Sequence, residues 1–295
     1  MSDNPVIQLP QLLREAVWRL FADEAMPLAG NIAFRMIFSI FPFLIFLTAL
    51  GGFFGNDTLA QRIVDFLLEV APDQLVSPLA PEIHRILTVP RTGLLSISAV
   101  LTIWSAMAGV DSVRVALNRA YDLKEQRTMA RLYGQNTGFI IVAAFGLLAV
   151  ALLIIGVPLL LAALERYAPG IRDNYLPLNL WRFPVAITLL LTGLVMAHLI
   201  LPARRLPLRQ ILPGVGLTLV AWIIMTVAYS QWLLRFNSFA STYASLSGIF
   251  AAMFFIYLSA LALILGGELN RVLALHRAQT KKAGGSLFPP ADDTA

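Results

Sequence analysis

Residues 101–131, LTIWSAMAGVDSVRVALNRAYDLKEQRTMAR, decide the fold because the chain changes there from apolar to amphipathic. Up to Val110 the residues are almost all apolar or small. Beyond Val110, polar residues recur every three or four positions opposite an apolar stripe with the same spacing; they are Asp111, Arg114, Asn118, Asp122 and Glu125. This pattern predicts one helix that leaves a bilayer and continues amphipathically along its surface.

The composition of the whole chain agrees with this interpretation. Of its 295 residues, 58% are hydrophobic and only 13% are charged, and the mean hydropathy is +0.75. A soluble core of this size needs far fewer apolar side chains, so the chain is predicted to be an integral membrane protein. The absence of cysteine excludes disulfides and thiolate chemistry.

Six apolar segments are long enough to cross a bilayer as helices. They give an all-α, polytopic fold with additional amphipathic helices at the interface. The predicted spans cover about 28–54, 93–110, 139–164, 183–201, 211–234 and 246–269. Pro42 and Pro158 lie inside two of these spans and are expected to kink them.

The chain is expected to have three parts: an interfacial segment (1–25), the transmembrane domain (26–271) and a polar tail (272–295), disordered from about residue 279. Residues 12–21 form an amphipathic helix that either lies at the headgroups or packs on a neighbour. Between the first two spans, the spacing of apolar residues predicts another amphipathic helix after Asp57 or Thr58.

The basic residues predict the orientation of the spans. Outside Arg35, fourteen Lys and Arg fall on one predicted side of the membrane and seven on the other. Because loops rich in Lys and Arg stay in the cytoplasm, both termini are predicted to be cytoplasmic. No cleavable signal peptide is evident at the amino terminus.

A group of polar residues is predicted in the cytoplasmic half of the bundle, as a substrate site or a structural cluster. Its members are Arg35, Asp111, Arg114, Asn118, Glu268 and Asn270. Arg35 either extends to the nearby headgroups or pairs with an acidic side chain or an anionic lipid. Glu268 is the natural counter-ion for Arg35 or Arg271, and such a pair could simply hold helices together.

The residues do not form a recognisable catalytic or metal site. The three histidines, His84, His198 and His276, lie far apart without ligand spacing, and no Walker loop or G-x-S-x-G elbow occurs. We therefore expect no cofactor, no metal and no enzymatic activity.

Two stretches resemble the signatures of a known family. IWSAMAGVDSVRVALNRAYDLKEQR is similar to the central signature of the YihY/BrkB family of bacterial inner-membrane proteins, and STYASLSGIFAAMFFIYLSALALILGGELNR is similar to its carboxyl-terminal one. AFRMIFSIFPFLIF and LRQILPGVGLTLVAWIIM resemble two further blocks, so the resemblance covers nearly all of 26–271. One departure is Tyr243-Ala244, where the family usually has Tyr-Gly.

The signature positions matched in this chain are Arg35, Ser39, Pro42, Trp104, Asn118, Tyr121, Asp122, Pro213, Gly214, Trp222, Tyr243, Gly266, Glu268, Leu269 and Asn270. The family was long labelled ribonuclease BN. The residues argue against that label, because a nuclease needs exposed metal ligands or a general acid and base.

The family's association with virulence and the bacterial envelope suggests a transporter or flippase-like protein of the inner membrane. Its partners would be membrane lipids, including an anionic lipid or glycolipid, and no nucleic acid. The alternative is a non-transporting scaffold or assembly factor that docks partners on the helix after Val110 and on the basic tail. A homo-oligomer or an envelope protein partner fits either hypothesis.

Overall fold

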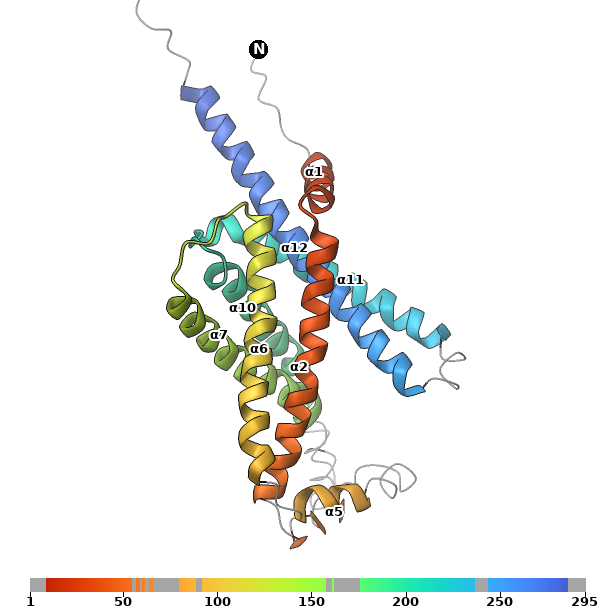
Figure 1. Cartoon of the computed structure of the whole chain (residues 1–295). Coiled ribbons are helices and arrows are strands. Elements are labelled where there is room, and N and C mark those ends of the chain that lie inside the picture. The colour runs from red at the N-terminus through yellow and green to blue at the C-terminus, as the bar shows by residue number, and fades with distance from the viewer. Residues whose placement is uncertain are drawn as a thin grey trace, which may run out of the picture. The chain divides into compact units, whose positions relative to one another are not determined.

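The computed structural model describes residues 9–54, 57–58, 60–61, 64–65, 80–88, 92–157, 161, 176–236 and 244–285. Every regular element within these ranges is a helix, which confirms the all-α prediction (Figure 1). The elements are α1 (Leu9–Ala22), α2 (Ala25–Phe54), α5 (Ala80–Thr88), α6 (Thr92–Ala120), α7 (Met129–Ala151), the π-helical turn η1 (Leu152–Gly156), α10 (Leu176–Ile200), α11 (Leu208–Phe236) and α12 (Ala244–Gly285).

Six of the described helices are long and apolar enough to cross a membrane, as predicted. These candidate spans are Ala25–Leu50, Gly93–Ala120, Met129–Ile154, Leu180–Ile200, Leu208–Trp232 and Gly248–Gln279. The most apolar window of each span is at most 22% buried. Apolar side chains exposed on this scale need a lipid environment, so the protein is a multi-pass membrane protein.

Several helices continue beyond the predicted spans. Helix α6 runs unbroken from Thr92 to Ala120, so the apolar and amphipathic parts of residues 101–120 belong to one helix, as predicted. Helix α12 continues to Gly285, and the prediction of disorder from residue 279 is wrong for residues 279–285. Apart from Thr280, the residues from Arg277 to Ala283 are good helix formers, and no glycine or proline occurs among them to stop the helix earlier.

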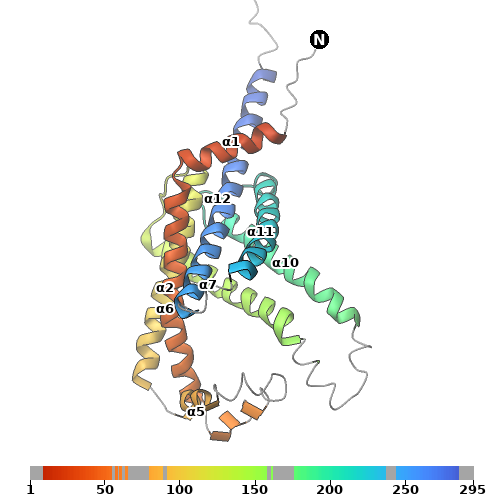
Figure 2. The ribbon, with the colours of Figure 1, turned by 90° about the vertical axis from the view of Figure 1, so that its right-hand side faces the viewer.

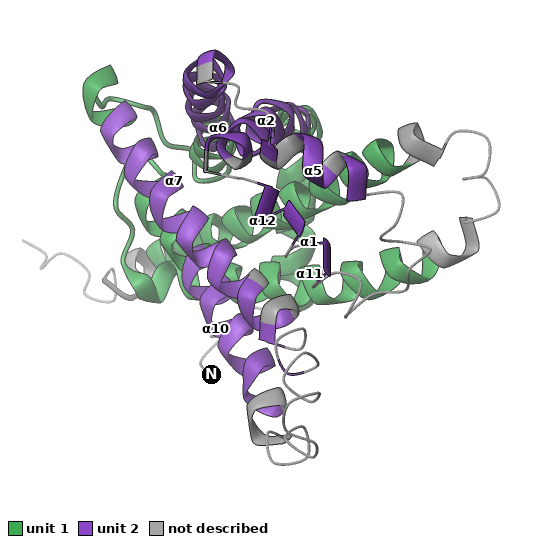
Figure 3. Cartoon of the chain, turned by 90° about the horizontal axis from the view of Figure 1, so that it is seen from below, with its two compact units in different colours: residues 1–33, 112–132, 194–295 green, residues 34–111, 133–193 purple. Residues whose placement is uncertain are grey.

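The chain divides into two compact units, coloured separately in Figure 3. Unit 1 comprises residues 1–33, 112–132 and 194–295, and unit 2 comprises residues 34–111 and 133–193. Helices α2, α6, α7 and α10 each contribute one end to each unit. The candidate site described below lies entirely in unit 1.

Unit 1 is built around α12. Helix α11 packs along it, and α1 crosses it (Figure 2). Leu12 and Ala16 of α1 form a buried cluster with Leu269 and Val272 of α12. The predicted helix over 12–21 therefore packs on a neighbour with one face.

The opposite face of α1 remains exposed and apolar. Val17, Trp18 and Phe21 are 43%, 67% and 60% exposed. These side chains suit the headgroup region, so a position at the membrane surface stays a prediction for this face.

Small residues allow α11 and α12 to approach closely. A Cβ atom at Gly214 would overlap the carbonyl oxygen of Gly266 and the Asn270 side chain, and a Cβ at Gly266 would overlap Thr218. The Thr218 hydroxyl lies 3.1 Å from the Ala262 carbonyl oxygen on α12. Close backbone contact through glycine is a common way to pack helices in membranes.

In unit 2, α2 and α6 run side by side (Figure 1). Arg35 of α2 donates a hydrogen bond from Nη1 to the Ala108 carbonyl oxygen of α6 at 3.1 Å. Pro42 lies within α2, which continues as a helix through it. Pro158 and most of the helix predicted after Asp57 lie outside the described residues.

Candidate functional site

The site begins at the turn that ends α6. The Leu123 N–H donates to the Asn118 carbonyl at 2.8 Å, and the Asp122 N–H donates to the Arg119 carbonyl at 3.0 Å. Asp122 adopts a left-handed backbone with a φ of 55°. This is a Schellman cap with aspartate where glycine is usual, and it fixes the directions of Tyr121 and Asp122.

Arg271 of α12 is held between two carboxylates. Its Nη1 donates to Asp23 Oδ2 and its Nη2 donates to Asp122 Oδ2, each at 2.8 Å. The Arg271 and Asp23 side chains are 17% and 20% exposed, whereas that of Asp122 is 75% exposed. The pair with Asp122 is therefore the weaker one, because exposed ion pairs contribute only about 0–1 kcal/mol.

Tyr121 lies at the centre of a buried hydrogen-bond network in unit 1. Its hydroxyl accepts from Asn270 Nδ2 at 2.9 Å and lies 2.7 Å from Nδ1 of His198. Since an amide nitrogen only donates, the hydroxyl proton goes to His198, which accepts through Nδ1. Burial raises the pKa of Tyr121, so the hydroxyl keeps this proton.

The same network connects α11 to α12 and leaves one group without a partner. The side-chain oxygen of Asn270 accepts from the Gly214 N–H at 2.7 Å, and its nitrogen donates to the Ile211 carbonyl at 3.0 Å. The proton of neutral His198 is on Nε2, and this buried nitrogen has no hydrogen-bond partner among the described residues.

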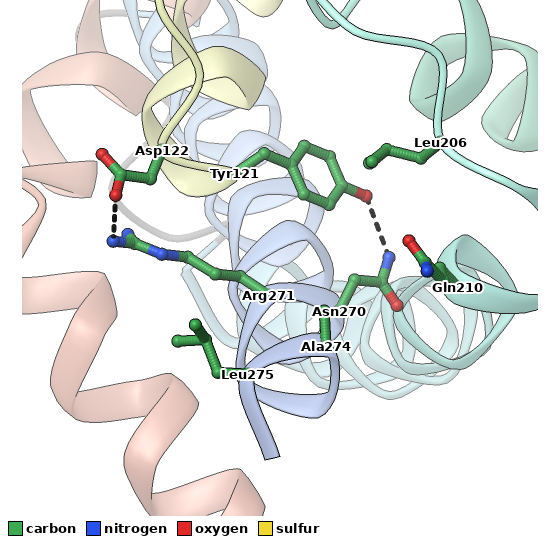
Figure 4. Close-up of a pocket in the computed structure, with 8 residues that line it drawn as sticks. All are labelled: Tyr121, Asp122, Leu206, Gln210, Asn270, Arg271, Ala274 and Leu275. Atoms are coloured by element: carbon green, nitrogen blue, oxygen red, sulfur yellow. Dashed lines mark hydrogen bonds and ion pairs between the residues drawn. The ribbon is translucent and has the colours of Figure 1, made fainter. Parts of the chain in front are cut away.

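Next to this network is a partly open pocket with a volume of about 260 Å³. Figure 4 shows the Arg271 guanidinium beside Asp122 on one side and the Tyr121 hydroxyl beside Asn270 on another. The pocket is lined by both polar and aliphatic side chains, namely those of Tyr121, Asp122, Leu206, Gln210, Asn270, Arg271, Ala274 and Leu275. The volume is somewhat below the roughly 300–1,000 Å³ of a drug-sized ligand site.

Glu125 anchors the loop that follows this turn. It accepts hydrogen bonds from Arg114 Nη1, Asn118 Nδ2 and both Nε and Nη2 of Arg127. Arg127 also donates to the Leu201 carbonyl at 2.8 Å. The hydrogen bonds from Arg127, and then that from Arg114, hold the pKa of Glu125 well below its ordinary value.

The structure divides the predicted polar cluster between the units. Arg35 and Asp111 are in unit 2, and the other four members are in unit 1. Within unit 1, Arg114 and Asn118 bind Glu125, whereas Asn270 binds Tyr121. Of the six residues, Asn270 lines the pocket. The common function of these six residues remains a prediction.

The expected ion pair between Glu268 and Arg271 is not what the structure shows. Arg271 forms its ion pairs with Asp23 and Asp122. Glu268 is 0% exposed, and neither of its carboxylate oxygens has a hydrogen-bond partner among the described residues.

Four residues were not predicted from the sequence as partners in these networks: Asp23, Glu125, Arg127 and His198. One sequence signal was available for Asp23, because Asp23-Glu24 is the only acidic pair between two apolar helical patterns. No comparable signal identifies His198. Within the described residues, no group of three or more His, Asp or Glu side chains could hold a metal ion.

Comparisons with known proteins agree with the resemblance found in the sequence. Residues 16–287 match the model of a family described as Virulence factor BrkB. A curated relative, the putative ribonuclease-like protein YfkH of Bacillus subtilis (strain 168), is 30% identical over 267 residues, which are 88% of this chain and 94% of the relative. No solved structure matches the chain significantly. The chain therefore belongs to the BrkB family of membrane proteins.

Proposed function

We propose that this protein binds an anionic lipid or lipid-linked envelope precursor and moves it between the leaflets of the bacterial inner membrane, with both termini in the cytoplasm. The observation that carries the proposal is the position of Arg271 in a headgroup-sized pocket that also has aliphatic walls. A guanidinium binds phosphate and carboxylate groups through paired hydrogen bonds. Leu206, Ala274 and Leu275 offer apolar surface to the adjoining part of a lipid.

An anion can reach Arg271 without breaking a buried pair. Asp122 is the exposed partner of Arg271, so an anionic headgroup can replace it while Asp23 stays bound. The Gln210 side chain lies next to Asn270 on the pocket wall and provides a further polar group (Figure 4). The pocket is also next to the end of the candidate span Gly93–Ala120 and the start of Leu208–Trp232, where a headgroup is within reach.

A ribonuclease activity has less support. The relative's name includes the words "ribonuclease-like", but phosphodiester hydrolysis needs a positioned nucleophile and a means to stabilise the leaving group. The pocket offers one guanidinium paired with carboxylates, which suits binding of an anion better than its hydrolysis.

The test compares wild type with Arg271→Gln and with the control Arg277→Gln. Arg277 is an exposed arginine farther along the same helix, so the control removes one charge outside the pocket. Native mass spectrometry of protein from vesicles of phosphatidylglycerol and phosphatidylcholine should show one retained phosphatidylglycerol in wild type and control. The Arg271→Gln variant should lose it.

The second step measures movement of fluorescent phosphatidylglycerol across vesicles that contain each protein. Transport by wild type and control, but not by Arg271→Gln, supports the proposal. Retention of the lipid without transport would overturn the transport function and favour a lipid-bound scaffold. Equal retention in all three proteins would overturn the assignment of the pocket.

A further inference from the structure

Glu268 is a buried carboxyl group whose surroundings suit its neutral form. Its side chain is 0% exposed, and as a carboxylate it has no hydrogen-bond donor among the described residues. An ionised group in this condition is strongly unfavourable. With a proton, Glu268 becomes a donor, and the adjacent Asp23 carboxylate offers an acceptor.

The charged groups around Glu268 are few. Asp23, Arg271 and Arg19 act on its carboxyl group. Asp23 is itself held by Arg271 and, from α6, by Arg119, with 3.6 Å between Arg119 Nε and Asp23 Oδ1. From α11, the uncharged residues Gly214 and Thr218 lie closest to Gly266, two positions before Glu268.

A short chain of contacts connects this carboxyl group to the pocket. Glu268 adjoins Asp23, and Asp23 binds the same guanidinium that lines the pocket, at 2.8 Å. A change of charge on Glu268 therefore acts on Arg271 both directly and through Asp23.

We propose that Glu268 is a proton-binding site whose occupancy controls the affinity of the Arg271 pocket for an anion. With Glu268 neutral, Arg271 is balanced by Asp23 and by the exposed Asp122, which an anion can replace. Loss of the proton places a second negative charge beside Asp23. This buried charge on Glu268 offsets the positive charge of Arg271 and repels an incoming anion. Proton and anion therefore bind together, and by linkage each increases the affinity for the other.

The identity of the anion rests on the proposed function, whereas the proton site rests on Glu268 and Asp23 alone. Coupled binding of this kind would allow a transporter to use a proton gradient to drive movement of an anionic lipid.

Infrared spectroscopy of the full-length protein without ligand tests the proton site. At neutral pH, wild type should show the carbonyl stretch of a protonated carboxylic acid. The Glu268→Gln variant should lose this band, and the control Glu24→Gln, which changes an exposed carboxylate next to Asp23, should retain it. Absence of the band from wild type, or its persistence in Glu268→Gln, would overturn the proton site.

Calorimetric titration tests the coupling, with short-chain phosphatidylglycerol as the probe because its phosphodiester does not titrate near neutral pH. Affinity for wild type should fall by ~5- to 150-fold between low-pH and high-pH plateaux. Glu268→Gln should bind with an affinity that does not depend on pH. Equal pH dependence in both proteins would overturn the coupling.

Glycerophosphoglycerol, the same headgroup without acyl chains, distinguishes a lipid from a free phosphodiester. Tight binding of the short-chain lipid alone identifies a lipid site, and equal binding of both probes identifies a headgroup site. If wild type binds neither probe at any pH, the proposed anion site and its coupling are overturned, while the infrared result still decides the proton site.

Discussion

The hydroxyl of Tyr121 lies 2.7 Å from Nδ1 of His198 and joins the end of α6 to α10 in the interior of unit 1. Both side chains are buried, with Tyr121 8% and His198 0% exposed. Together with Asn270, they form a continuous path of hydrogen bonds from α10 through α6 to α12. This network forms one boundary of the pocket.

Removal of the Tyr121 hydroxyl should destabilise unit 1. In Tyr121→Phe, His198 Nδ1 loses its donor and Asn270 Nδ2 loses an acceptor. Leaving buried polar groups unsatisfied costs about 1–3 kcal/mol. The free energy of unfolding in detergent measures the loss. Tyr133→Phe is the control because Tyr133 is 58% exposed, and equal stability of both variants would contradict the prediction.

The contact between α11 and α12 should tolerate no side chain at Gly214. In Gly214→Ala the new Cβ meets the Gly266 carbonyl and the Asn270 side chain, so the helices must move apart. Overpacking of this kind costs about 1–3 kcal/mol. Gly216→Ala is the matched control, because a Cβ at Gly216 has nothing within 4 Å.

Gly216→Ala should stabilise the same helix by roughly 0.5–1 kcal/mol, since alanine is the better helix former. Thermal unfolding of the two variants in one detergent compares them. A loss of stability at Gly216 as large as that at Gly214 would show that the close approach is not the cause.

Among the carboxylates of the loop after α6, Glu125 should cause the largest loss of stability when it is substituted. Glu125→Gln removes the ion-pair partner of Arg114 and Arg127, whose side chains are only 9% and 10% exposed. Loss of one partner of a buried pair costs up to about 3–5 kcal/mol. Denaturant unfolding measures this loss, and Glu24→Gln, which changes an exposed residue, should be nearly silent.

Stability should also fall at acidic pH. Hydrogen bonds from Arg127 lower the pKa of Glu125, and a hydrogen bond from His276, helped by Arg19, lowers that of Glu15. A carboxyl whose pKa is lower in the folded state stabilises the fold above its unfolded pKa, about 4.3 for glutamate, and this contribution is lost as pH falls further. Unfolding midpoints between neutral pH and pH 3 should show the decline.

The variant Glu125→Gln distinguishes the contribution of Glu125 to this pH dependence from that of Glu15. It lacks the titrating group in the loop, so its stability should vary less with pH below about 4.3 than that of wild type. A slope unchanged by the substitution would assign the acid sensitivity to other groups.

Hydropathy and helical periodicity predicted the helices well, because each span is a local property of its own residues. The end of α12 was predicted too early in the chain. Polar residues such as Gln279 and Lys281 have the composition of a disordered tail, although their intrinsic propensity favours a helix.

The partners of Arg271 could not be predicted from sequence spacing. Glu268 is three residues away on the same helix, a separation that favours contact. The left-handed turn at Asp122 and the break between α1 and α2 bring two more distant carboxylates to the guanidinium instead. The contact between Asn270 and Tyr121 joins residues 149 positions apart, a relationship that no local pattern encodes.

Helix α12 is a single element of 42 residues, from Ala244 to Gly285. At about 1.5 Å per residue, the part beyond Gly266 is roughly 28 Å long and acts as a lever arm. A tilt of about 5° at the glycine contact with α11 would displace its far end by roughly 2.5 Å. The length of α12 would therefore convert small rearrangements around Glu268 and Arg271 into a larger displacement of its far end. A spin or fluorescent label at that end would report this displacement as a change of distance.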